Sequence, residues 1–147
     1  TLPVAQVVGR TDLALFPVAG YLVYGSPDLT ALLCILFFYP WALAHLAVND
    51  IADIENDRAR GMATIPVLYG MGGAARWVLG FSAVHGVIAL VFGLALGPVA
   101  LAGFAAGIIL LGVANYLVFA GAAMRALPLV HATLIIYAVA IIAAAVL

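Results

Sequence analysis

The chain has 147 residues, of which 68% are hydrophobic and only 7% are charged. Soluble domains carry about 25% charged residues, so this composition excludes a soluble protein and predicts an all-α integral membrane protein surrounded by membrane lipid. The net charge is −1 and all five basic residues are arginines, which excludes the basic surface of a nucleic-acid-binding protein.

Long apolar runs predict the membrane spans, because a spanning helix needs about 20 such residues. Five segments qualify, and together they predict a single transmembrane domain over residues 1–147 with a multi-pass topology. The predicted spans are residues 4–24, 29–48, 77–96, 99–120 and 128–147. The first is the least regular, since Arg10, Asp12 and Pro17 fall within it. Residues 49–76 form a polar loop that separates the second and third spans.

The arginines predict how the chain is oriented in the membrane. With five spans, one side of the membrane receives all five of them: Arg10, Arg58, Arg60, Arg76 and Arg125. Basic residues concentrate in cytoplasmic loops, so this side, with the loop 49–76, is predicted to be cytoplasmic.

Small residues predict where the helices pack closely. Gly103 and Gly107 are four positions apart in the fourth predicted span, a spacing that lets two helix backbones approach each other. We expect this surface to pack within the chain rather than to form a dedicated dimer interface.

The polar loop carries a regular series of aspartates. Asp50, Asp53 and Asp57 have offsets of 0, 3 and 7, so on one continuous helix they project from the same face, while Glu55 points away. Converging carboxylates repel one another unless a cation lies among them, and an oxygen-only ligand set suits Mg²⁺ or Ca²⁺. Because Mg²⁺ completes its coordination with water and phosphate oxygens, this pattern favours a phosphorylated substrate.

Arg58 and Arg60 follow directly, and arginine suits phosphate oxygens through its planar fork. Glycines and a proline then predict a loop or a broken helix over the site: Gly61, Pro66 and Gly70. The residues alone leave a second interpretation open, in which the segment is a solvated loop with helix-capping carboxylates and topology-setting arginines.

A longer pattern resembles a known motif. It reads Asp50-Ile-Ala-Asp53-Ile-Glu-Asn-Asp57-Arg-Ala-Arg-Gly61, followed by Thr64-Ile-Pro-Val67 and Gly70. This resembles the second aspartate-rich motif of the UbiA superfamily of intramembrane prenyltransferases. The resemblance implies a helical bundle in which two such motifs hold Mg²⁺ on the diphosphate of a polyprenyl donor. The prenyl group then passes to an aromatic or lipid acceptor.

The resemblance also implies roles for individual residues. Asp53 and Asp57 are the expected catalytic Mg²⁺ ligands, and Asp50 is the expected third ligand. Contacts to the substrate are expected from four further residues: Asn49, Arg58, Arg60 and Arg76.

The chain departs from the family in having one aspartate motif and about half the expected length. Two predicted spans precede the motif and three follow it, which resembles the C-terminal half of the bundle. One hypothesis is therefore half of a prenyltransferase completed by a second chain: an identical copy, a separate N-terminal half or part of a larger membrane complex. The alternative is a non-catalytic structural, lipid-binding or pigment-binding subunit. A small cation transporter is disfavoured, because the aspartates lie at a helix end rather than within a span.

Histidines provide the remaining candidates. His45 lies one helical turn before Asn49 and is either an acid or base of the site or a polar contact between helices. His85 and His131 have no partner at the spacing of metal ligands.

Overall fold

The structure is a computed structural model that describes residues 3–9 and 11–147. Within these ranges it contains helices and no strands, which confirms the predicted all-α class. The elements are α1 (Val4–Gly9), α2 (Thr11–Tyr24), α3 (Leu29–Ala52), α4 (Ile54–Ala59), α5 (Ile65–Leu96), α6 (Pro98–Phe119) and α7 (Ala123–Val146).

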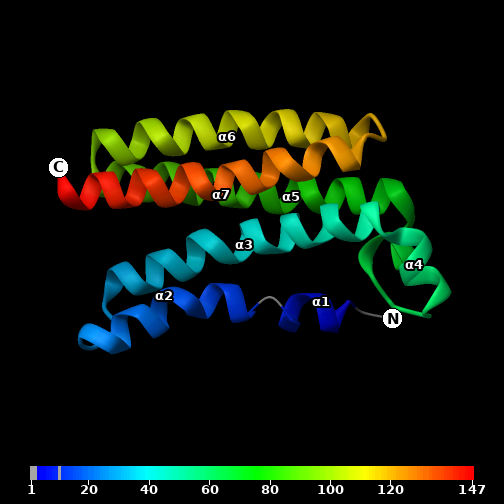
Figure 1. Ribbon diagram of the computed structural model, residues 1–147, viewed down its shortest axis with the longest axis horizontal. Helices are drawn as coiled ribbons and strands as arrows, with labels where there is room; N and C mark the ends of the chain where they lie inside the picture. Colours follow the sequence, from blue (N-terminus) through cyan, green and yellow to red (C-terminus); the bar gives the residue numbers. More distant parts are fainter. Residues whose placement is uncertain (1–2, 10) are drawn as a thin grey trace.

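Figure 1 shows α3, α5, α6 and α7 running lengthwise beside one another, with α1 and α2 following α3 in the opposite direction. The N-terminal end, α4 and the α6–α7 turn lie at one end of the bundle. The α2–α3 turn, the α5–α6 turn and the C-terminus lie at the other end. Arg58, Arg60 and Arg125 therefore belong to the same end, Arg76 lies about three turns into α5, and Arg10 lies outside the described residues.

By length and composition, four helices in the described part of the chain can cross a membrane: α3, α5, α6 and α7. The predicted first span is instead divided into two shorter helices, α1 and α2. Polar side chains at the division bond to the local backbone, since Thr11 Oγ1 donates to Val8 O (2.8 Å) and Asp12 Oδ1 accepts from Leu13 N (2.7 Å). Such bonds compete with helix continuation.

The other boundaries differ from the predicted ones mainly at the polar loop. Helix α5 begins at Ile65, well before the predicted start at residue 77, so much of the segment 49–76 is helical. The expected broken helix is present, because the backbone at Gly70 has φ 70° and ψ 176° within α5. Gly61, with φ 67°, follows the end of α4. Both angles lie in the region that only glycine adopts readily.

Aromatic rings form the centre of the bundle. Phe37 of α3 is fully buried and stacks on Phe104 of α6, with the ring centres 4.8 Å apart. Tyr137 of α7 packs against Phe37 at 5.1 Å and against Phe104 at 5.5 Å. Gly107 faces the Tyr137 ring and Gly103 faces Ala140, so both glycines pack α6 against α7 within the chain, as expected.

Candidate functional site

The aspartate segment does not form the continuous helix that its spacing predicts. Helix α3 ends at Ala52, and Asp53 has φ −111° and ψ 14°, with its N–H directed to Asn49 O (3.1 Å) and Asp50 O (3.3 Å). Helix α4 then starts at Ile54. The geometric argument from offsets on one helix face is therefore wrong in detail, because the backbone changes direction between Asp50 and Asp57.

The aspartates nevertheless reach a common space. A cavity of about 290 Å³ at this end of the bundle is lined by residues of α3, the α3–α4 junction, α4 and α7. Its lining residues are Asn49, Asp50, Ala52, Asp53, Asp57, Met124 and Leu127. We call it the acid cavity. Glu55 does not line it and is exposed, in agreement with its predicted opposite orientation.

The three aspartates of the acid cavity have different surroundings. Asp50 is buried and accepts a hydrogen bond from the side-chain amide of Gln6. Asp53 is exposed and its Oδ1 accepts from Asn56 Nδ2 at 2.5 Å. Asp57 is 6% exposed, and its Oδ2 has no hydrogen-bond partner among the described residues. A buried polar atom without a partner costs about 1–3 kcal/mol, and more if it is charged, so Asp57 favours a ligand that supplies positive charge.

The donor set fits a hard divalent ion. No group of three His, Cys, Asp or Glu side chains in the described structure is already gathered around one point. Mg²⁺ does not need such a cage, since it commonly uses one or two carboxylates and completes its shell with water and phosphate oxygens. Asp57, with Asp50 or Asp53 across the acid cavity, meets this requirement.

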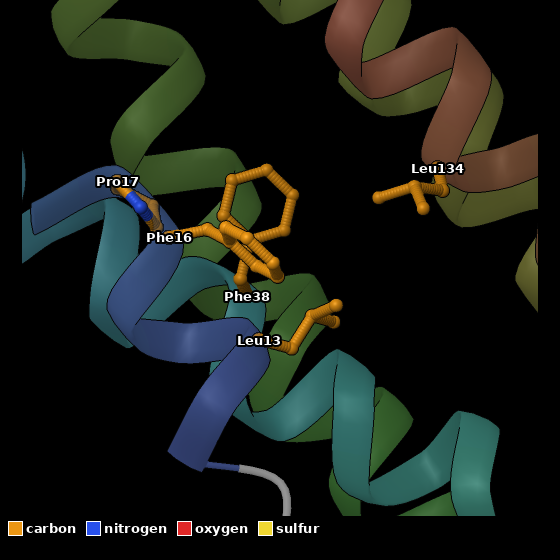
Figure 2. Close-up of a pocket in the computed structure, with 5 residues that line it drawn as sticks. All are labelled: Leu13, Phe16, Pro17, Phe38 and Leu134. Atoms are coloured by element: carbon orange, nitrogen blue, oxygen red, sulfur yellow. The ribbon is translucent and has the colours of Figure 1, made fainter. Parts of the chain in front are cut away.

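An apolar pocket of about 380 Å³ lies further along the same helices. Figure 2 shows Phe16 and Phe38 close together beside Pro17, with Leu134 of α7 across the gap from them. Leu13 completes the lining. Phe38 and Asn49 are three helical turns apart on α3, and Leu134 and Leu127 are two turns apart on α7. The two hollows are therefore both bordered by α3 and α7, at different levels along these helices.

The sequence matches the UbiA prenyltransferase family over residues 1–122. The chain belongs to this family. Its fold matches the apo structure of a UbiA homolog from Aeropyrum pernix K1, with a TM-score of 0.72 and 23% sequence identity. That match covers 94% of this chain and 53% of the homolog, so the chain spans about half the homolog's length. A comparison with curated protein sequences gives no match.

Membership of the UbiA family and four long apolar helices make this chain a multi-pass membrane protein of prenyltransferase type. The arginines of the motif do not line the acid cavity in this structure. Arg58 pairs with Glu55 at 3.4 Å on the surface, and Arg60 is exposed. Arg76 donates from Nε to Gly72 O (3.1 Å) on the exposed side of α5.

Gln6 is a residue of the site that the sequence analysis missed. Its side chain is 7% exposed, donates to Asp50 and accepts from Ile65 N at 3.1 Å. The first N–H groups of a helix lack partners within the helix, and Thr64 makes no side-chain cap for α5, so Gln6 fulfils that role. It thereby joins the aspartate motif to the start of α5. The sequence signal that could have indicated this role is that Gln6 is an amide side chain within an otherwise apolar stretch.

Replacing Gln6 by alanine is expected to lower the thermal unfolding temperature in detergent by several degrees. The change removes one hydrogen bond from Asp50 and the cap from the N–H of Ile65, and a buried donor without its partner costs about 1–3 kcal/mol. Val8→Ala is the matched control, because Val8 lies on the same helix with an exposed side chain. Equal unfolding temperatures for the two variants would contradict the proposed role of Gln6.

Proposed function

We propose that the acid cavity binds the diphosphate of a polyprenyl donor through Mg²⁺, and that the prenyl group is transferred to an aromatic or lipid acceptor. The observation that carries this proposal is Asp57, a buried carboxylate with an unpartnered oxygen at a cavity it shares with Asp50 and Asp53. Membership of the UbiA prenyltransferase family supports it.

In this proposal the aspartates hold the metal, with Asp53 and Asp57 as principal ligands and Asp50 as the third. When bound, Mg²⁺ would neutralise diphosphate charge and act as a Lewis acid on the leaving group. Asn49 offers its amide to the same cavity. Arg58 and Arg60 would turn toward the diphosphate. Breaking the exposed Arg58–Glu55 ion pair costs little free energy, because such a pair contributes only about 0–1 kcal/mol to stability. Arg76 remains a further candidate for contact with the diphosphate.

The apolar pocket between α2, α3 and α7 is proposed to hold the prenyl tail. Like the acid cavity it is bordered by α3 and α7, so in this proposal one extended donor lies along these two helices and occupies both. Its lining is apolar, and each methylene of the tail that moves from water into such a site contributes about 0.8 kcal/mol to the free energy of binding.

Catalysis is proposed to require further spans, because the chain covers about half of the Aeropyrum pernix homolog. The hypothesis from the sequence assigns these spans and a second aspartate motif to another chain. The alternative, a non-catalytic subunit that binds lipid or pigment, shares the fold but does not require the aspartates to bind a metal.

The test is binding of geranylgeranyl diphosphate to the purified protein in mild detergent, with Mg²⁺ and with EDTA, by isothermal titration calorimetry. We expect saturable binding that disappears with EDTA. Equal binding with Mg²⁺ and with EDTA, or no binding in either condition, would reject the proposal and favour the non-catalytic subunit. Native mass spectrometry of the same sample reports whether a second chain accompanies this one.

Filling the apolar pocket tests the position of the tail. Leu134→Trp is expected to weaken binding of geranylgeranyl diphosphate about tenfold, equivalent to displacing two methylenes at about 0.8 kcal/mol each, while the shorter geranyl diphosphate binds as before. Ile135→Trp is the matched control, because Ile135 is the next residue along α7 and is 65% exposed, outside this pocket. An equal effect of both substitutions, or an equal effect on both donors, would place the tail elsewhere.

A further inference from the structure

Two histidines that are far apart in the sequence, His45 of α3 and His131 of α7, meet in the structure. His45 Nε2 and His131 Nε2 are 2.9 Å apart, which is hydrogen-bond distance, and the ring centres are 4.8 Å apart. The sequence offers His131 no partner at the spacing of metal ligands, and its partner in the folded chain is 86 positions away. His131 is exposed and His45 is half-buried, so the pair is accessible.

Contacts of Trp41 and Thr133 fix the position of the histidine pair. The ring of His45 stacks on Trp41 in a nearly parallel arrangement, with an angle of 4° and the ring centres 5.0 Å apart. Trp41 is 1% exposed, and its indole N–H donates to Thr133 Oγ1 on α7 at 2.8 Å. Thr133 in turn donates to Val130 O at 2.7 Å. These contacts tie α3 to α7 at the level of the histidines and orient the rings before any ligand arrives.

Along both helices the pair lies at a level between the acid cavity and the apolar pocket. On α3, His45 is one turn from Asn49 of the acid cavity and two turns from Phe38 of the apolar pocket. On α7, His131 falls between Leu127 of the acid cavity and Leu134 of the apolar pocket. A donor with its diphosphate in one hollow and its tail in the other places its first prenyl carbon beside these rings.

Transfer of a prenyl group releases one proton from the acceptor. The bond between the first prenyl carbon and the diphosphate oxygen breaks, and the bonding electrons leave with the diphosphate. The acceptor supplies the electron pair for the new bond to that carbon and loses a proton. Carboxylates engaged with a metal are poor proton acceptors, so another base is needed close to the reacting carbon.

We propose that the His45–His131 pair is the acceptor subsite, which binds an acceptor with a phenolic or alcoholic hydroxyl and takes its proton on His131. This inference rests on the proposed function. In the neutral pair one Nε2 donates its hydrogen to the other, and the donating ring keeps a lone pair on Nδ1. With His131 as the donating ring, the hydroxyl proton moves to its Nδ1. The imidazolium that forms is stabilised by its hydrogen bond to His45.

The other ionisable groups on the surrounding helices are engaged or lie elsewhere. Tyr39 on α3 donates to Val7 O (2.8 Å), and Asp12 on α2 is exposed at the start of its helix. His85 on α5 donates to Phe37 O (2.8 Å), and Tyr137 on α7 is fully buried among the core rings. Further groups lie toward the helix ends: the aspartates of the acid cavity near the end of α3, Arg125 at the start of α7, and Cys34 and Tyr21 toward the α2–α3 turn. Arg76 on α5 bonds to its own helix at Gly72 O.

The test uses 4-nitrophenol as the hydroxyl probe, because its ionised form absorbs visible light and no turnover is needed. Bound to the wild-type protein in detergent, it is expected to ionise about one pH unit lower than in detergent alone, a tenfold change in its ionisation equilibrium. His131→Gln is expected to abolish this shift, although glutamine can still hydrogen-bond to His45. His45→Gln is expected to reduce it, and Tyr116→Phe, on the exposed face of α6, to leave it unchanged.

A shift that survives in His131→Gln, or that is lost in Tyr116→Phe, would overturn the acceptor subsite. Binding of geranylgeranyl diphosphate with Mg²⁺ is measured on the same proteins, and saturable binding by His131→Gln shows that this variant is folded. Donor binding without a wild-type probe shift would overturn this inference alone. A probe shift without donor binding would overturn the proposed function and, with it, the assignment of this hydroxyl-binding pair to prenyl transfer.

Discussion

Asp57→Asn is expected to weaken Mg²⁺-dependent binding of geranylgeranyl diphosphate at least about a hundredfold. The substitution keeps the size of the side chain but removes the charge of a carboxylate that is 6% exposed at the acid cavity. Losing one partner of a buried, hydrogen-bonded charge pair costs about 2–5 kcal/mol, and a hundredfold change corresponds to about 2.7 kcal/mol. Calorimetric titration of the donor in the presence of Mg²⁺ measures the loss.

The same substitution is expected to raise the unfolding temperature of the protein without ligand. Asp57 Oδ2 is buried without a hydrogen-bond partner in the described structure, so removing its charge relieves a cost that the folded state carries. Stability and binding therefore change in opposite directions, which a general folding defect cannot produce. This opposition is typical of residues kept for function rather than for stability.

Glu55→Gln is the matched control for Asp57→Asn. Glu55 lies on the same short helix, α4, but it is exposed and pairs with Arg58 on the surface. Its removal is expected to change stability by no more than about 1 kcal/mol and to leave donor binding intact. Equal losses of binding in the two variants would mean that α4 contributes only a general negative charge, and the assignment of Asp57 as a metal ligand would fail.

The sequence predicts the membrane helices well where local signals are strong. The end of α5 at Leu96 and the start of α6 at Pro98 lie close to the predicted boundaries, since Gly97 and Pro98 favour a turn whatever surrounds them. The start of α5 is missed by twelve residues because glycines and an arginine resemble a loop in sequence. In the folded chain the N–H of Ile65 is capped by Gln6 from α1, which no local pattern reveals.

Of the residues expected at the site, the aspartates and Asn49 line the acid cavity, whereas the arginines do not. The aspartates of the motif do share a cavity, yet the helix breaks at Asp53, so their convergence depends on the turn between α3 and α4. The contact between His45 and His131 joins residues 86 positions apart. Its only sequence signal is that each histidine falls on the helix face that the cavity residues share, and this becomes visible once α3 and α7 are known to be neighbours.

Gly107→Ala is expected to be strongly destabilising, with a large fall in the unfolding temperature measured by circular dichroism in detergent. A methyl group at this position would overlap the ring of Tyr137. That ring cannot withdraw, because it is fully buried and packs against Phe37 and His85, both with ring centres 5.1 Å away. Adding a methyl group to a filled core costs about 1–3 kcal/mol, and more where neither side can move.

Gly112→Ala is the control for this prediction, since Gly112 lies on the same helix and an added methyl group there meets nothing within 4 Å. Alanine is the better helix former by about 1 kcal/mol, so this variant is expected to be as stable as wild type or more stable. A double-mutant cycle with Tyr137→Ala then isolates the contact. If the overlap with Tyr137 causes the loss, the double variant is more stable than the sum of the single changes predicts. Strictly additive effects would instead mean that Gly107 is needed for its backbone freedom, independently of the α6–α7 contact.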